Sequence, residues 1–225
     1  GQQVCESDTL EEIQYSVGSA LTNVAFNWEK CPLNSDCNID NDSDGEPDNR
    51  IPIGTPPGVQ WDLNTDSGYL RVYGSPIENI TEPFRYYFTI QPIGNACDDT
   101  AKTGYFDVLV EPKLEIDPNS GSLYQRVCEG DAITDIIFNL VDGAQNAQVT
   151  GLPNSLNYVT NDNSGDPNTP DQLIISGQVD AGNINDVFTF VVTAQNPNGQ
   201  CFFNQQGEIT INRPDDLHLI SNGLE

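Results

Sequence analysis

The stretch "QVCESDTLEEIQYSV", Gln3–Val17, occurs a second time in altered form as "RVCEGDAITDIIFNL", Arg126–Leu140. The alignment pairs a cysteine with a cysteine and apolar positions with apolar positions: Cys5 with Cys128, Ile13 with Ile136, and Tyr15 with Phe138. Self-similarity at a fixed spacing is the sequence signature of a chain built from structural repeats. The sequence therefore predicts two copies of one unit.

Three further stretches match between the two copies, and they follow one another in the same order. The matches are "LRVYGSP" (Leu70–Pro76) with "LIISGQV" (Leu173–Val179), "YFTIQPIGNAC" (Tyr87–Cys97) with "FVVTAQNPNGQC" (Phe190–Cys201), and "TGYFDVLVEP" (Thr103–Pro112) with "QGEITINRP" (Gln206–Pro214). Together the matches account for most of the chain.

Within each copy, apolar residues alternate with polar ones along short segments. Ile136, Phe138 and Leu140 fall on one face of such a segment, and Ile13, Tyr15 and Val17 repeat the pattern. Alternation of this kind, interrupted by Gly, Pro, Asn and Asp, indicates strands and turns. About seven short strands in roughly 100 residues are typical of an immunoglobulin-like sandwich. We expect an all-β protein of two tandem immunoglobulin-like β-sandwich domains.

The matches also predict the limits of each part. The first domain covers residues 1–113 and contains an acidic insertion at about 29–52, and a short turn-rich junction follows at 114–123. The second domain covers residues 124–214, and residues 215–225 form a tail or the start of another junction. We therefore expect a piece of a longer array in which the partners of each unit are neighbouring repeats of the same chain.

The chain is strongly acidic, with 8 Lys and Arg against 34 Asp and Glu and a formal net charge of −26. This charge repels nucleic-acid phosphates and anionic membrane surfaces, so neither is an expected partner. No apolar run approaches the length of a membrane span. The surplus of carboxylates instead favours divalent cations.

Six cysteines, no methionine and a single histidine suggest an oxidising, extracellular compartment. Cys5 and Cys97 occupy the same repeat positions as Cys128 and Cys201. The simplest pairing is therefore one bridge within each domain, Cys5–Cys97 and Cys128–Cys201, and a local bridge Cys31–Cys37.

The segment "CNIDNDSDGEPDNR", Cys37–Arg50, is the best candidate for a metal site. In D-x-D-x-D-G loops, carboxylates at alternate positions converge on calcium, a glycine permits the turn, and a backbone carbonyl joins them. The expected ligands are Asp40, Asp42, Asp44, Glu46 through its carbonyl, and Asp48, completed by Asp36, because Ile51 stands where an EF-hand loop has its last glutamate. The alternative is an acidic loop that only interacts with solvent.

The repeat motifs carry a resemblance to a known family. "VCEGD", "VTGLP" (Val149–Pro153), "LIISGQV", "FTFVVTAQNPNGQC" and "GEITI" resemble the repeat units of large Bacteroidetes cell-surface proteins, such as the SprB-type gliding-motility adhesins. The resemblance implies export across the outer membrane and display as a filament on the cell surface. It also implies a role in adhesion and gliding, with a surface polysaccharide or a substratum as partner.

Two other functions are alternatives to an adhesin repeat. Trp28, Trp61 and the aromatic stretch Phe84–Phe88 suggest a sugar-stacking platform, as in a carbohydrate-binding module of a secreted hydrolase, although aromatic residues at strand spacing are more often core. The sequence gives little support for catalysis. The only histidine, His218, lies in the tail, which disfavours a Ser-His-Asp or Cys-His site, and no nucleotide-binding glycine loop is present. The sequence therefore favours a non-catalytic repeat.

Overall fold

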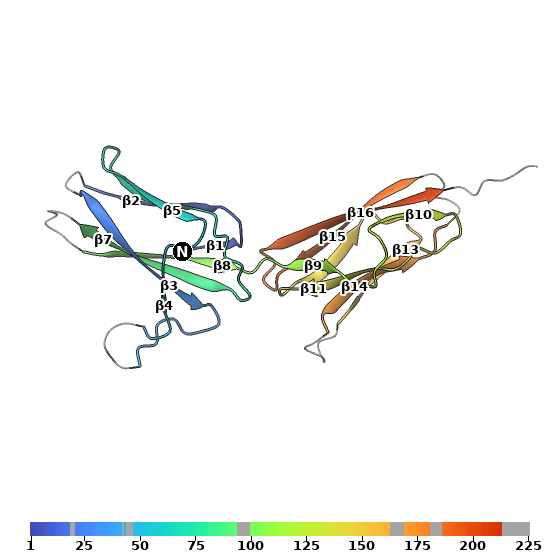
Figure 1. Ribbon diagram of the computed structural model, residues 1–225, viewed down its shortest axis with the longest axis horizontal. Helices are drawn as coiled ribbons and strands as arrows, with labels where there is room; N and C mark the ends of the chain where they lie inside the picture. Colours follow the sequence, from blue (N-terminus) through green and yellow to red (C-terminus); the bar gives the residue numbers. More distant parts are fainter. Residues whose placement is uncertain are drawn as a thin grey trace, which may run out of the picture. The chain divides into compact units, whose positions relative to one another are not determined.

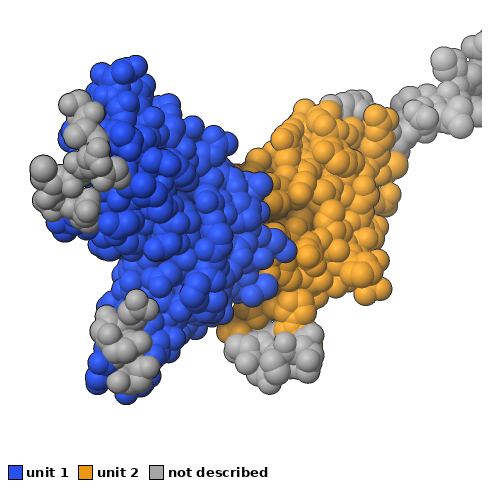
Figure 2. All heavy atoms as spheres, turned by 60° about the vertical axis from the view of Figure 1, so that its left-hand side comes forward, with its two compact units in different colours: residues 1–111 blue, residues 112–225 orange. Residues whose placement is uncertain are grey.

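The structure is a computed structural model that describes residues 1–18, 21–41, 43, 47–93, 100–162, 169–180 and 186–212. The chain divides into two compact units, Gly1–Glu111 and Pro112–Glu225 (Figures 1 and 2). All regular elements of the described residues are β-strands. Among these residues there is accordingly no helix that is long and apolar enough to cross a bilayer.

The first unit consists of two facing sheets. Its eight strands are β1 (Gln2–Cys5), β2 (Leu10–Ser16), β3 (Asn23–Pro32), β4 (Ile51–Ile53), β5 (Val59–Asn64), β6 (Tyr69–Gly74), β7 (Phe84–Ile93) and β8 (Lys102–Leu109). One sheet has the order β1-β8-β7-β3-β4 and the other has the order β2-β6-β5.

The second unit repeats this architecture with one strand more in the second sheet. Its strands are β9 (Lys113–Ile116), β10 (Tyr124–Cys128), β11 (Ile136–Val141), β12 (Gln145–Thr150), β13 (Leu156–Asn161), β14 (Asp171–Gly177), β15 (Val187–Gln195) and β16 (Phe202–Asn212). The sheets have the orders β10-β16-β15-β12 and β13-β14-β11-β9.

The strand order identifies the fold of each unit. In the second unit, β9, β11, β14 and β13 take the places of strands A, B, E and D of an immunoglobulin domain, and β12, β15 and β16 take those of C, F and G. A short strand pairs in parallel with the last strand of each unit, β1 with β8 and β10 with β16, while the other strand pairs are antiparallel. Both units are immunoglobulin-like sandwiches, which confirms the predicted fold class.

The register of the strands confirms the internal repeat. Tyr15 of β2 lies opposite Leu70 of β6, and the aligned residue Phe138 of β11 lies opposite Leu173 of β14. The sequence alignment pairs the same residues, Tyr15 with Phe138 and Leu70 with Leu173. Equivalent sequence positions therefore occupy equivalent places in the two sheets.

Each unit has its own hydrophobic core, built from the inward side chains of the alternating segments. In the first unit, Trp28 on β3 is 4% exposed and packs 5.2 Å from Phe88 and 6.3 Å from Phe106, measured between ring centroids. The core of the second unit is mainly aliphatic around Phe138 and Phe190. Burial of side chains of this size contributes about 1.5 to 3 kcal/mol each to folding.

The boundary between the units differs from the predicted junction at residues 114–123. The division lies between Glu111 and Pro112, and β9 begins at Lys113 and pairs with β11. Leu114 on β9 is 7% exposed and belongs to the core of the second unit. The segment expected to be a junction is thus the first strand of the second sandwich.

Candidate functional site

The acidic insertion of the first unit connects β3 to β4. Its start is fixed by a disulfide between Cys31 and Cys37, both of which are buried. This bridge confirms the local pairing predicted from the sequence. A cross-link across so short a loop restricts the unfolded chain and holds the base of the insertion against the sheet.

Two of the predicted calcium ligands lie where the acidic loop closes on itself. The Asp48 backbone N–H donates to the Ile39 carbonyl over 2.8 Å, and the Asn41 N–H donates to the Asp48 carboxylate over 2.5 Å. The Asp40 carboxylate accepts a hydrogen bond of 2.6 Å from the Ser43 N–H. Asp40 and Asp48 therefore flank the same turn, with their carboxylates bound to backbone donors.

Arg50 fastens the end of the insertion to the sheet below it. Its guanidinium donates to the Cys37 carbonyl and to the side-chain oxygen of Asn38, both over 3.0 Å. The same guanidinium lies over the ring of Tyr87, 3.7 Å from the centroid, and 3.5 Å from the Glu29 carboxylate. Cation–π contact and hydrogen bonds to carbonyls together fix the loop end.

The remaining predicted ligands are only partly observed. Asp42, Asp44 and Glu46 lie outside the described residues, and the Asp36 carboxylate accepts a hydrogen bond from the Asn38 N–H. Among the residues that the structure describes, no three acidic, histidine or cysteine side chains form a group able to hold a metal ion. Calcium binding at this loop stays a prediction.

The long disulfide predicted for the second unit is wrong. Cys128 is a free, exposed thiol and lies opposite Asn212 in the parallel pair of β10 and β16. Cys201 stands just before the other end of β16, a strand of 11 residues, so about 36 Å of extended chain separates the two positions. A disulfide needs Cα atoms about 4.4 to 6.8 Å apart.

The bridge Cys5–Cys97 predicted for the first unit is wrong as well. Cys5 and Cys201 are each bonded in a disulfide, whereas Cys31 is joined to Cys37 and Cys128 is free. Of the six cysteines, a Cys5–Cys97 bridge would leave none to bond Cys201.

A buried ion pair that the sequence did not reveal lies on the sheet of β7 and β8. Arg85 donates to both carboxylate oxygens of Asp107 over 2.7 and 3.0 Å, and Gln3 adds a hydrogen bond of 3.2 Å. The Asp107 side chain is only 4% exposed. The composition could have indicated this pair. The chain has only 8 Lys and Arg against 34 Asp and Glu, so an arginine within a strand is expected to pair with an acidic residue.

A second polar cluster lies near the start of β7. Tyr86, which is buried, donates to Glu78 over 2.6 Å, and Lys30 contacts the other oxygen of that carboxylate at 2.5 Å. Burial alone would raise the pKa of Glu78, but the hydrogen bonds from Lys30 and Tyr86 outweigh it and lower that pKa. Burial and the bond to Glu78 raise the pKa of Tyr86 well above its ordinary value.

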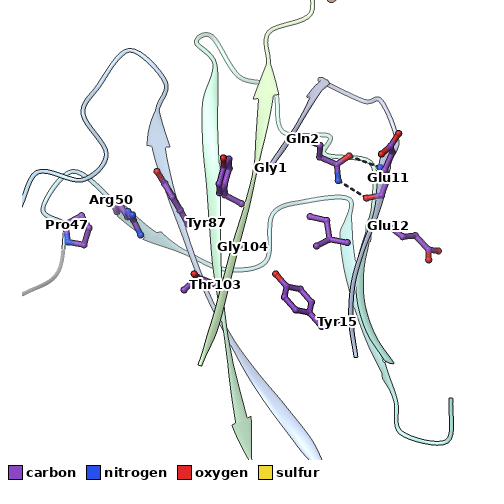
Figure 3. A pocket seen from close by; sticks show the side chains of 12 residues that line it. Gly1, Gln2, Glu11, Glu12, Tyr15, Pro47, Arg50, Tyr87, Thr103 and Gly104 are labelled. Carbon is purple, nitrogen blue, oxygen red and sulfur yellow. Dashed lines mark hydrogen bonds between the residues drawn. The ribbon is translucent and has the colours of Figure 1, made fainter. Parts of the chain in front are cut away.

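The first unit also contains an open cavity of about 830 Å³ between its two sheets (Figure 3). Ile13 and Tyr15 of β2 line one side, and Thr103, Gly104 and Tyr105 of β8 line the other. The charged residues of the lining are Glu11, Glu12 and Arg50.

The tryptophans do not form the sugar-stacking platform that the sequence suggested. Trp28 is buried, and Trp61 packs into the same core with its ring stacked 4.6 Å from that of Phe26. In the stretch Phe84–Phe88, Tyr86 and Phe88 are buried as well. The aromatic residues of the first unit mainly build its core.

Comparisons with known proteins add little to this picture. No protein-family model matches the sequence, and no curated protein matches it. Among solved structures, the chain is similar to "Anomalous substructure of Titin-A168169", with 12% identity, coverage of 95% of this chain and 94% of that one, and a TM-score of 0.35. It is also similar to "Crystal Structure of Rst D1-D2", with 11% identity, coverage of 95% of both chains and a TM-score of 0.36. The fold of each unit is established by its own strand order.

Proposed function

We propose that the chain is a non-catalytic segment of an extracellular, cell-surface repeat protein that takes part in adhesion. The observation that carries this proposal is the succession of two immunoglobulin-like units with matched sequence and matched register. Units of one kind placed in series extend a protein from a surface, and they do so without an active site.

Several features support an extracellular location and a structural role. The Cys31–Cys37 bridge suits an oxidising environment, and the charge of −26 keeps a long, crowded molecule soluble. The burial of Trp28 and the packing of Trp61 remove the main argument for a carbohydrate-binding module of a hydrolase. A role in gliding motility is a more specific part of this proposal, and only the sequence resemblance supports it.

Calcium belongs to the same proposal as a structural ion of the acidic insertion. The support is the turn that brings Asp40 and Asp48 to one end of a loop rich in aspartate. Extracellular calcium is abundant, so a site with a Kd of about 10⁻⁴ to 10⁻³ M is sufficient.

The proposal is tested on the cells that make the protein. An antibody raised against this chain should label intact, unpermeabilised cells, and deletion of the coding region should reduce their attachment and their movement on glass. Labelling that requires permeabilised cells contradicts the surface location, and unchanged attachment contradicts the adhesive role.

A further inference from the structure

The second unit contains a groove of about 690 Å³ between the outer strands of its two sheets. β12 is the last strand of one sheet and β13 is the last strand of the other, and residues of both strands line the groove. Leu140 and Ala147 form the apolar part of the lining, and Ala147 is only 6% exposed. The volume lies within the range of about 300 to 1,000 Å³ that is usual for small-molecule sites.

A β-bulge in β12 brings consecutive residues to this groove. Gln145 pairs with Gln195 and Gln148 pairs with Thr193, so β12 has one residue more than β15 in this interval. Alternate residues of a regular strand point to opposite faces, yet all four residues from Gln145 to Gln148 line the groove. Asn146, within the bulge, has a φ of 48°, which asparagine tolerates better than most residues. The bulge thus places three residues with side-chain amides along one rim.

The other rim contributes an aromatic ring and hydroxyl groups. Tyr158 and Thr160 of β13 line the groove, and Asn161 lies beside them. The Tyr158 side chain is 39% exposed, so part of its ring is accessible. Side-chain amides and hydroxyls both donate and accept hydrogen bonds, and an aromatic ring offers an apolar face. This combination suits a ligand that carries neighbouring hydroxyl groups on a saturated ring.

The first unit closes the same place with aromatic side chains. Trp61 pairs with Val72 as Tyr158 pairs with Ile175, and the sequence alignment matches Val72 with Ile175. The Trp61 ring is stacked 4.6 Å from that of Phe26, and both residues pack against the core of the first unit. Tyr158 therefore stands, partly exposed, at a position that the first unit fills with a packed ring.

A second position on the same strand changes in the same way. Leu63 pairs with Leu70 and packs against the core of the first unit. Thr160, which pairs with the aligned residue Leu173, is exposed and lines the groove. The groove is thus not a consequence of the shared fold. It results from polar residues at positions where the first unit has apolar ones.

The charges around the groove exclude one class of ligand. Among the described residues that line it, none is lysine, arginine or histidine, whereas Asp162 and Asp171 are acidic. The whole chain has a formal net charge of −26. A negatively charged ligand would be repelled by this field, and an uncharged ligand would not be.

We propose that the groove between β12 and β13 binds a neutral oligosaccharide. The amides of Gln145 and Asn146 donate to and accept from neighbouring hydroxyl groups of a sugar ring. The ring of Tyr158 contacts the apolar C–H face of a sugar. The inference rests on the proposed adhesive role and makes it more specific, because it assigns a chemical class of ligand to one of the two units.

The test uses the full chain and an array of short neutral oligosaccharides of glucose, galactose and mannose, printed beside oligosaccharides that carry uronic acids or sulfate. The neutral glycans should bind and the charged ones should not. Calorimetric titration with the neutral glycan that binds best should give one site per chain and a Kd of about 0.1 to 1 mM. This Kd should agree within about twofold between low salt and about 0.3 M salt, because the ligand carries no charge.

Three substitutions locate the ligand. Asn146→Gly removes the amide and supplies a residue that adopts positive φ without strain, and it should weaken binding by about tenfold or more. Tyr158→Ala should have an effect of similar size. Val159→Thr is the matched control and should leave the affinity unchanged, because Val159 is 53% exposed on the same strand and is not among the residues that line the groove. Urea denaturation establishes that each variant is folded.

The inference is overturned if no neutral glycan binds, if the charged glycans bind better, or if binding survives Asn146→Gly and Tyr158→Ala. Should one of these two variants fail to fold, the other decides, since they lie on different strands. All these measurements use the purified chain, whereas the adhesive role is tested by labelling and attachment of cells. A negative result here therefore leaves the proposed adhesive role standing, and a failure of surface labelling does not alter a measured affinity.

Discussion

Cys128 lies directly opposite Asn212, at the end of β16 that is remote from Cys201. Because β10 runs parallel to β16, the opening cysteine and the closing cysteine of this unit stand at opposite ends of the sandwich. Cys128 is therefore a free and exposed thiol.

The cysteines give the first prediction. Alkylation of the folded, unreduced chain should label Cys128, and Cys128→Ser should remove this label. Peptide mapping without reduction should recover Cys31 joined to Cys37 and should identify the partners of Cys5 and Cys201. A peptide that joins Cys128 to Cys201 contradicts the observed strand pairing.

Sequence reasoning succeeded where local periodicity decides the structure. Alternation predicted the strands, and the alignment of Tyr15 with Phe138 predicted equivalent places in the two sheets, as their partners Leu70 and Leu173 confirm. Both results follow from the fact that a strand with one buried face has a fixed register.

The same reasoning failed where the structure depends on contacts between distant segments. The alignment established which cysteines are equivalent, but equivalence does not say which of them face each other. The segment Lys113–Ile116 was too short and too close to turn residues to indicate a strand, although Leu114 and Ile116 alternate. For the acidic loop, the sequence supplied the ligand types, and the described residues test only Asp36, Asp40 and Asp48.

The second prediction concerns the buried ion pair of Arg85 and Asp107. Arg85→Ala should reduce the free energy of unfolding of the first unit by about 3 kcal/mol, because it leaves the Asp107 carboxylate buried without its charged partner. Urea denaturation of both proteins measures the change. Arg71→Ala is the matched control, since Arg71 pairs with Asp62 and Glu12 at the surface, and it should cost a small fraction of that. Equal effects of the two substitutions contradict the role given to burial.

The third prediction follows from the lowered pKa of Glu78. A carboxyl with a lower pKa in the folded state stabilises the fold above its unfolded pKa, near 4.5, and this contribution is lost as the pH falls through the lower folded value. At pH 7, Glu78→Gln should destabilise the first unit by about 1 kcal/mol, since the hydrogen bonds from Lys30 and Tyr86 then reach a neutral group.

The pH dependence separates this effect from a loss of packing. The difference in unfolding free energy between the native chain and Glu78→Gln should be constant from pH 7 to about pH 5 and should shrink below pH 4.5. Denaturation in urea at each pH measures it. A difference that persists unchanged to pH 2.5 would mean that the charge of Glu78 plays no part.

The last prediction concerns calcium at the acidic insertion. Asp40 and Asp48 lie at one turn of a loop that contains two further aspartates, and no basic residue precedes Arg50 in that loop. A cation that binds only the folded state adds stability as RT ln(1 + [L]/Kd), which is about 1.4 kcal/mol at ten times Kd. For a unit of this size the melting temperature should rise by about 5 °C.

Calorimetry with calcium and with a chelator should therefore shift the transition of the first unit and leave that of the second in place. Asp44→Ala should abolish the shift, whereas Asp66→Ala, which removes one exposed charge between β5 and β6 of the same unit, should preserve it. Removal of an ion that is bound to the folded state must lower the stability of that state. If the first unit melts at the same temperature with and without calcium, the loop therefore binds no calcium and is an acidic surface segment.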